Sequence, residues 1–158
     1  MNSTRVYYIG LVFCVAIIGV LGCTFERVIE PFPKKNLAAG WSYSDTLVFT
    51  NINWKENENL KLRISISDTF EFENIYLKGS FWQTRDTVVS KVFSIQLADK
   101  FGNWLGKCSS SICTLDYDLT QASILPEQDK LSISISQWTR DSILTGVSGL
   151  QLVCSKKD

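Results

Sequence analysis

The chain has 158 residues, and 16 Lys and Arg balance 16 Asp and Glu, which gives a net charge of zero. This length favours one domain, and the neutral charge excludes the basic surface that nucleic acids require, so we expect no nucleic-acid partner. Histidine is absent, which excludes Ser-His-Asp and Cys-His catalytic sites and imidazole metal ligands. We therefore expect a protein that is not an enzyme and has no cofactor and no metal.

The N-terminus has the pattern of an export signal. Arg5 is followed by an unbroken run of apolar, aromatic or glycine residues over 6–22. The segment Val20-Leu21-Gly22-Cys23 resembles the lipobox of bacterial lipoproteins. We predict a lipoprotein signal peptide over 1–22, with Cys23 acylated and the mature chain attached to a membrane through its acyl chains. The alternative is an uncleaved membrane anchor in which Cys23 is incidental.

The segment after Cys23 shows no clean periodicity and contains two prolines, Pro31 and Pro33. We predict a lipidated N-terminus and tether over 23–40, followed by a domain over 41–158 that is soluble on its own. Thr24 rather than Asp follows the cysteine. By resemblance to the sorting rule of Gram-negative envelopes, this favours the outer membrane. We favour the periplasmic leaflet over the cell surface for the anchor.

From position 41 onward, apolar and polar residues alternate with a period of two, as is typical of half-buried strands. The pattern is weaker over 46–54 and 147–154. One-sided alternation predicts antiparallel sheets with one face in the core. The expected inward residues are Leu60, Leu62, Ile64 and Ile66; Ile75, Leu77 and Phe81; Val89, Phe93, Ile95 and Leu97, with Lys91 on the same parity; Leu115, Tyr117 and Leu119; and Leu131, Ile133 and Ile135.

These segments predict an all-β fold. We expect a single antiparallel β-sandwich, immunoglobulin-like or jelly-roll, of about seven to eight strands. Turn-forming residues separate the strands at 55–59, 68–74, 83–86, 99–103 and 139–146.

The cysteines of the mature chain allow more than one pairing. Cys108 and Cys113 could close a small loop between strands, because exported compartments permit disulfides. Cys154 would then be a buried, free thiol. A bond from either Cys108 or Cys113 to Cys154 is the alternative, since spacing alone does not fix connectivity.

Carboxylates and tryptophans offer weaker signals. Asp116 and Asp118 would share a strand face, either as a glycosidase acid pair or as the solvated face of a half-buried strand. Asp99 and Asn103 could contribute to a calcium site. Trp82 and Trp138 lie on the parity opposite to the aliphatic residues of their strands. They could form a platform for a glycan or a protein partner, or they could cover a second face or a loop.

The segment from Leu97 to Lys107 reads Leu-Ala-Asp-Lys-Phe-Gly-Asn-Trp-Leu-Gly-Lys. It resembles the gliding-motility lipoproteins of the GldH family, found across the Bacteroidota, which carry an L-A-D-x-x-G-x-W-L-G-K-G run. Here Cys108 replaces the last glycine. Supporting matches occur at Trp41, Asp45 and Phe49, at 73–77, and at Gln137, Arg140, Leu144, Gly146 and Val147.

The resemblance implies a non-catalytic, lipid-anchored envelope protein that supports gliding and the associated type IX secretion machinery through protein partners. The family-motif residues are Asp99, Gly102, Trp104, Leu105, Gly106 and Lys107. We expect them to form a tight turn through Gly102, with Trp104 plugging one end of the sandwich. The alternative function is a carbohydrate- or peptidoglycan-binding module, with Trp82 or Trp138 as its platform.

The lipobox generates a direct prediction. Only a thiol can form the diacylglycerol thioether, so Cys23→Ser should block both lipid transfer and signal cleavage. The variant should retain residues 1–22 and remain in the inner membrane, because the apolar run still partitions there. Mass spectrometry of the mature N-terminus checks this. An unmodified Cys23 in the wild-type protein, or a chain that begins at Met1, would contradict the lipoprotein assignment.

Overall fold

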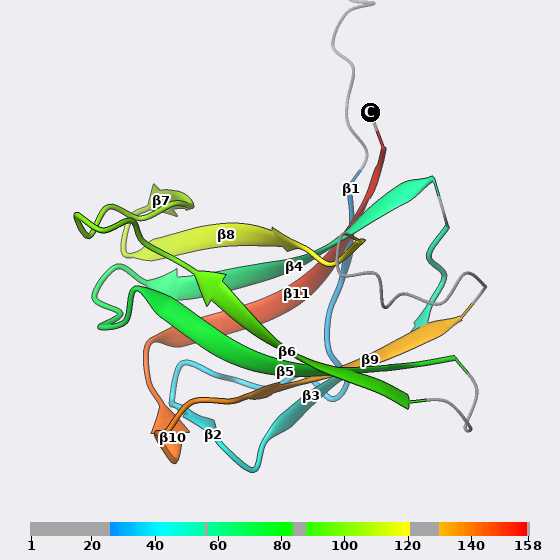
Figure 1. The fold of residues 1–158 in the computed structure, drawn as a ribbon, viewed down its shortest axis with the longest axis horizontal. Coiled ribbons are helices and arrows are strands. Elements are labelled where there is room, and N and C mark those ends of the chain that lie inside the picture. The colour runs from blue at the N-terminus through cyan, green and yellow to red at the C-terminus, as the bar shows by residue number, and fades with distance from the viewer. Residues whose placement is uncertain (1–25, 56, 84–87, 121–129, 158) are drawn as a thin grey trace, which may run out of the picture.

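The computed structural model describes residues 26–55, 57–83, 88–120 and 130–157. The strands of these residues form two facing antiparallel sheets and one small ribbon, so the predicted all-β sandwich is confirmed (Figure 1). The predicted signal peptide over 1–22 and the predicted acylation site Cys23 lie outside the described residues. Among the described residues, no helix is long and apolar enough to cross a membrane.

The first sheet has the strand order β1-β11-β4-β8-β7. Its two long strands, β4 and β11, pair along most of their length and form its centre. The bounds are β1 Glu26–Ile29, β4 Glu58–Ser67, β7 Lys107–Ser109, β8 Ile112–Asp118 and β11 Val147–Lys156.

The second sheet has the order β3-β9-β5-β6, and a two-stranded ribbon joins β10 to β2. The bounds are β2 Trp41–Ser42, β3 Thr46–Ile52, β5 Asn74–Trp82, β6 Val88–Gln96, β9 Leu131–Gln137 and β10 Ile143–Leu144. The described residues thus contain 11 strands rather than seven or eight. Strands β1, β2, β7 and β10 have four residues or fewer, too short for alternation to reveal them.

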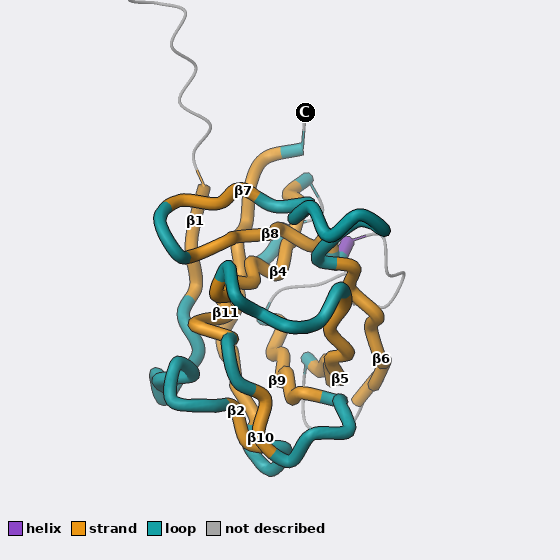
Figure 2. The backbone as a smooth tube through the Cα atoms, turned by 90° about the vertical axis from the view of Figure 1, so that its left-hand side faces the viewer, coloured by secondary structure: helices purple, strands orange, loops and turns teal. Residues whose placement is uncertain are grey.

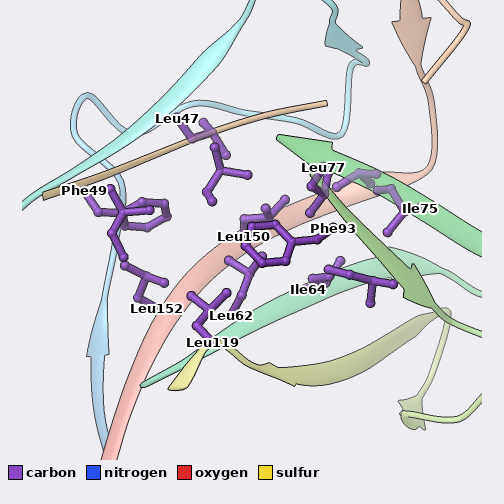
Figure 3. Close-up of a cluster of buried hydrophobic side chains, with 14 of the residues drawn as sticks. Leu47, Phe49, Leu62, Ile64, Ile75, Leu77, Phe93, Leu119, Leu150 and Leu152 are labelled. Carbon is purple, nitrogen blue, oxygen red and sulfur yellow. The ribbon is translucent and has the colours of Figure 1, made fainter. Parts of the chain in front are cut away.

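The core lies between the sheets, where the inward residues of both meet (Figure 3). In β4 and β9, buried aliphatic residues alternate regularly with half-buried polar ones, as the sequence predicts. Aromatic rings from the two sheets also contact each other in the core. Phe93 of β6 packs edge-on against Tyr117 of β8, with centroids 5.8 Å apart. Each fully buried aliphatic side chain contributes about 1.5–3 kcal/mol relative to exposure, which makes this interface the main source of stability.

The predicted tether is largely part of the folded domain. β1 pairs with β11 over its whole length, from Glu26 opposite Ser155 to Ile29 opposite Leu152. Leu37 is only 1% exposed and belongs to the core. The expected domain start at Trp41 therefore lies inside the sandwich. Four residues give too little alternation to distinguish β1 from a tether.

The sequence interpretation also placed Val89 in the core with Phe93 and Ile95, and this is wrong. Val89 is 39% exposed, and its neighbours Val88 and Val92 are exposed as well. Lys91, on the inward parity, is also exposed. The first half of β6 therefore lacks the burial that alternation implies, and core packing begins at Phe93.

The inclusion of β1 and Leu37 predicts the effect of truncation. A chain that begins at Trp41 should unfold at lower urea concentration than one that begins at Glu26. The free energy of unfolding should fall by about 3 kcal/mol or more, because removing one buried leucine alone typically costs 2–5 kcal/mol. Tryptophan fluorescence during urea unfolding measures it. Equal midpoints and slopes for the two chains would restore the tether assignment.

Candidate functional site

The two ends of the sandwich differ in what they carry. At one end, which we call the amino-terminal end, the first residue of β1 lies beside the last residues of β11 (Figure 1). At the other end, which we call the opposite end, the connections 68–73, 97–106 and 138–146 come together. Figure 2 looks onto this opposite end, with its loops crossing between the sheets. The family-motif residues Asp99 to Gly106 and Trp138 all belong to the opposite end.

Asp99 organises the family-motif turn. Its Oδ1 accepts hydrogen bonds from the backbone amides of Phe101 (2.8 Å) and Asn103 (2.9 Å), and its Oδ2 accepts one from Asn103 Nδ2 (3.0 Å). The Asn103 contacts, and then the Phe101 amide, lower the pKa of Asp99. Gly102 has φ +82°, a conformation that favours glycine. The turn through Gly102 is therefore as the sequence predicts.

Asp99 and Asn103, the candidate calcium ligands, are bonded to each other within the turn, where both Asp99 oxygens accept N–H groups. In the described part of the chain, no cluster of three or more His, Cys, Asp or Glu side chains could hold a metal ion.

Trp104 closes the opposite end of the sandwich. It forms a β-bridge with Ala98, is half-buried, and packs against the hydrophobic core. Gly106 then passes so close to β8 that an added Cβ would lie 2.3 Å from the carbonyl oxygen of Thr114. Leu105 is 53% exposed, and Lys107 is also exposed. The motif thus mainly stabilises this end of the fold, whereas Leu105 and Lys107 are exposed to solvent.

Leu105 and Lys107 line a groove of about 540 Å³ on the outer face of the first sheet. Arg63 of β4 crosses its floor, donating to both oxygens of Asp116 (2.7 Å each) and to Glu26 of β1 (3.1 Å). The two carboxylates raise the pKa of Arg63 further above its usual value, with the Asp116 hydrogen bond the largest cause. This network ties β8, β4 and β1 together. Exposed ion pairs contribute about 0–1 kcal/mol each, so its effect on stability is small.

Asp116 and Asp118, the candidate acid pair, both make hydrogen bonds within the first sheet and its adjoining turn. Asp116 is held bidentately by Arg63, and Asp118 accepts the amide of Thr120 at 2.8 Å and its hydroxyl. The carboxylates are used in strand and turn contacts on a half-exposed sheet face, and of the two only Asp116 lines the groove.

Cys108 and Cys113 form a disulfide across the β7–β8 hairpin, where they are directly paired residues. Cys154 is a buried free thiol, opposite Arg27 in the β1–β11 pair. Burial raises the pKa of the Cys154 thiol, which the Arg27 guanidinium partly offsets.

Trp82 and Trp138 are not one platform. Trp82 ends β5 and pairs with Ser132, whereas the amide of Trp138 donates to the carbonyl of Tyr76 near the start of β5 (2.8 Å). The six residue-to-residue steps from Tyr76 to Trp82 correspond to about 20 Å of strand. Trp82 is half-buried near the amino-terminal end, and only Trp138 lies at the opposite end.

Trp138 lies at the edge of a hollow of about 550 Å³. We call it the aromatic pocket. Its lining residues are Phe72, Asn74, Tyr76, Trp138, Thr139, Arg140 and Asp141. The indole is held by Tyr43, with ring centroids 5.7 Å apart, and by Lys78, whose Nζ lies 4.9 Å from the ring centroid. Trp138 is still 43% exposed.

Gln137 fixes the loop that carries four of these residues, from Trp138 to Asp141. It is fully buried, its Nε2 donates to the carbonyl of Asp141 (2.9 Å), and its Oε1 accepts the amide of Thr139 (2.9 Å). Burying an amide without partners costs free energy, so these bonds make the loop conformation specific. From the sequence, Gln137 and Arg140 are only supporting matches to the family pattern. Phe72, Tyr76 and Asp141 have no predicted role, because the pocket forms only where two segments far apart in the sequence meet.

The sequence matches the family model of the GldH lipoprotein over residues 32–152. The chain belongs to the GldH lipoprotein family. The match covers the core strands, the Trp104 turn and the aromatic pocket. The family is a gliding-motility-associated group of lipoproteins of the cell envelope, as the sequence resemblance implied.

No curated protein matched the chain. Among solved structures, one match is a beta-porphyranase of glycoside hydrolase family 86 from the human gut bacterium Bacteroides plebeius, at 12% identity and TM-score 0.37. It covers 85% of this chain, and the chain spans only 21% of that protein. Another is Xyl-CBM35 in complex with a glucuronic acid containing disaccharide, at 14% identity and TM-score 0.33. This match covers 87% of the present chain and 96% of Xyl-CBM35. Likeness at this level carries no functional argument.

The two motif glycines should respond differently to substitution. Gly106→Ala would press a methyl group against the Thr114 carbonyl, so the free energy of unfolding should fall by about 3 kcal/mol. In Gly102→Ala, the added Cβ would meet no atom within 4 Å. The free energy of unfolding should therefore fall only by the cost of the positive φ, about 1 kcal/mol. Chemical unfolding of both variants measures the difference. Equal losses would show that the β8 contact is not what requires glycine at 106.

Proposed function

We propose that this chain is a non-catalytic, lipid-anchored protein of the outer membrane that supports gliding motility and the associated type IX secretion machinery through protein–protein contacts. The observation that carries the proposal is membership of the GldH lipoprotein family over residues 32–152. The sequence supports the anchor through its lipobox at Cys23.

The position of β1 defines how such an anchor would present the domain. Cys23 is three residues before Glu26, the first residue of β1. Three extended residues span at most about 10–11 Å. The amino-terminal end of the sandwich would therefore lie close to the lipid headgroups. The opposite end, with the Trp104 turn and the aromatic pocket, would face away from the membrane and toward soluble partners.

The free edge of β6 supports a protein-binding role. The amides of Leu97 and Ala98 both donate to the carbonyl of Glu73, at 2.7 and 3.1 Å. Hydrogen bonds alternate along an antiparallel pair, so the odd-numbered residues of β6 bond to β5. The even-numbered residues direct their backbone N–H and C=O groups outward, and these residues are Val88, Ser90, Val92, Ser94 and Gln96.

The other sheet edges are less suited to pairing. In the first sheet, the edge strands β1 and β7 have only four and three residues. In the second sheet, β3 is partly covered, because the amide of Phe32 donates to the carbonyl of Val48 (2.8 Å). Among the described strands, β6 is the long edge strand without such cover, and three exposed valines accompany it. Such an edge can accept a partner segment as an added strand.

Complementation of a gene deletion tests both parts of the proposal. The deletion should abolish spreading and export of type IX substrates, and the wild-type gene should restore both. Val92→Pro should fail to complement, since proline removes an outward N–H that β5 does not use. Val92→Thr, which keeps the N–H, should complement.

Protein amount and thermal midpoint of the variants must be measured in parallel, because proline on an edge strand should cost little stability. Normal spreading and export in the deletion strain would contradict the function. Full complementation by Val92→Pro would contradict the role of the β6 edge while leaving the function intact.

A further inference from the structure

We propose that the aromatic pocket binds a sugar residue of a neutral glycan, a binding function beyond the protein contacts of the β6 edge. The pocket lies at the opposite end of the sandwich, and its volume of about 550 Å³ is within the range typical of small-ligand sites. Phe72, Tyr76 and Trp138 expose aromatic surface there. A pyranose ring has an apolar C–H face, which packs well against such rings.

The polar groups of the pocket match the hydroxyl rim of a sugar. Arg140 contributes N–H donors and Asp141 contributes carboxylate acceptors, and both are exposed. Within the described part of the chain, neither side chain has an ion-pair or hydrogen-bond partner. Asn74 donates to the hydroxyl of Tyr76 at 3.2 Å, which leaves its own carbonyl oxygen as an acceptor. Sugar hydroxyls both donate and accept, so they can satisfy all three groups.

Other ligand classes fit this pocket less well. A purely apolar ligand would remove water from Arg140 and Asp141 without replacing their hydrogen bonds, which costs free energy. An anion would face the Asp141 carboxylate, and a cation would face Arg140. A backbone-pairing peptide would require a free strand edge, whereas beneath the pocket β5 is paired with β6 on one side and the Tyr76 carbonyl accepts the Trp138 amide on the other.

The pocket is also pre-organised. Gln137 fixes the loop from Trp138 to Asp141 through bonds to both Thr139 and Asp141. Tyr43 packs against the indole of Trp138, and the Lys78 ammonium lies over its ring. Little conformational freedom is therefore lost when a ligand binds, and this favours affinity from a small contact area.

Isothermal titration calorimetry on the full-length lipoprotein tests the inference. The protein should be purified in a detergent without a sugar headgroup. The probes are the neutral oligosaccharides chitotetraose and cellotetraose. At least one probe should bind the wild-type protein. Trp138→Ala and Asp141→Ala should each weaken binding by about tenfold or more, because stacking and polar contacts are lost separately.

Trp82→Ala is the matched control, since it removes a tryptophan from the same sheet at the other end and should leave affinity unchanged. Circular dichroism verifies that each variant is folded. Because Trp138 and Asp141 are exposed and belong to different parts of the pocket, one folded variant is sufficient for the test. The inference is overturned if no probe binds at millimolar concentration, if Trp138→Ala and Asp141→Ala bind like the wild type, or if Trp82→Ala weakens binding as much as they do.

Discussion

Burial of alternating aliphatic side chains between two antiparallel sheets is the constraint on which the rest of this structure depends. Because β4 and β9 each place every second residue in the core, their connections must emerge at the ends of the sandwich. Core packing thus brings together the loops that leave the strands at the same end, including those at the opposite end that carry exposed aromatic and charged groups. The location of the candidate sites is a consequence of hydrophobic burial, not of any local motif.

Two polar side chains then give shape to the opposite end. Asp99 accepts three hydrogen bonds within the Trp104 turn, and the buried Gln137 uses both its amide nitrogen and its oxygen on the adjoining 138–141 loop. Each satisfies backbone groups that would otherwise need water. The family motif and the aromatic pocket both adjoin the start of β5, because the Leu97 and Ala98 amides donate to Glu73 and the pocket is lined by Asn74. The motif contributes rigidity, and the pocket contributes exposed chemistry.

The amino-terminal end has a different character. β1 joins the first sheet beside β11, and Arg63 connects it to β8 through Glu26 and Asp116. In the proposed lipoprotein, this pairing replaces a long, flexible tether with a short connection. The domain would then have a defined orientation, with the strands of the first sheet leading away from the membrane. A fixed orientation limits which surfaces soluble partners can reach.

The sequence by itself determined the sandwich and its inward residues in β4, β5, β8 and β9, because period-two alternation reports burial directly. It also predicted the turn at Gly102 and the family, since local chemistry carries both. The core position of Leu37, the role of β1, the exposure of Val89 and the separation of Trp82 from Trp138 were decided only by the tertiary structure. Alternation specifies which side of a strand a residue occupies. It does not specify whether another sheet covers that side, how a four-residue strand pairs, or which distant segments meet to form a pocket.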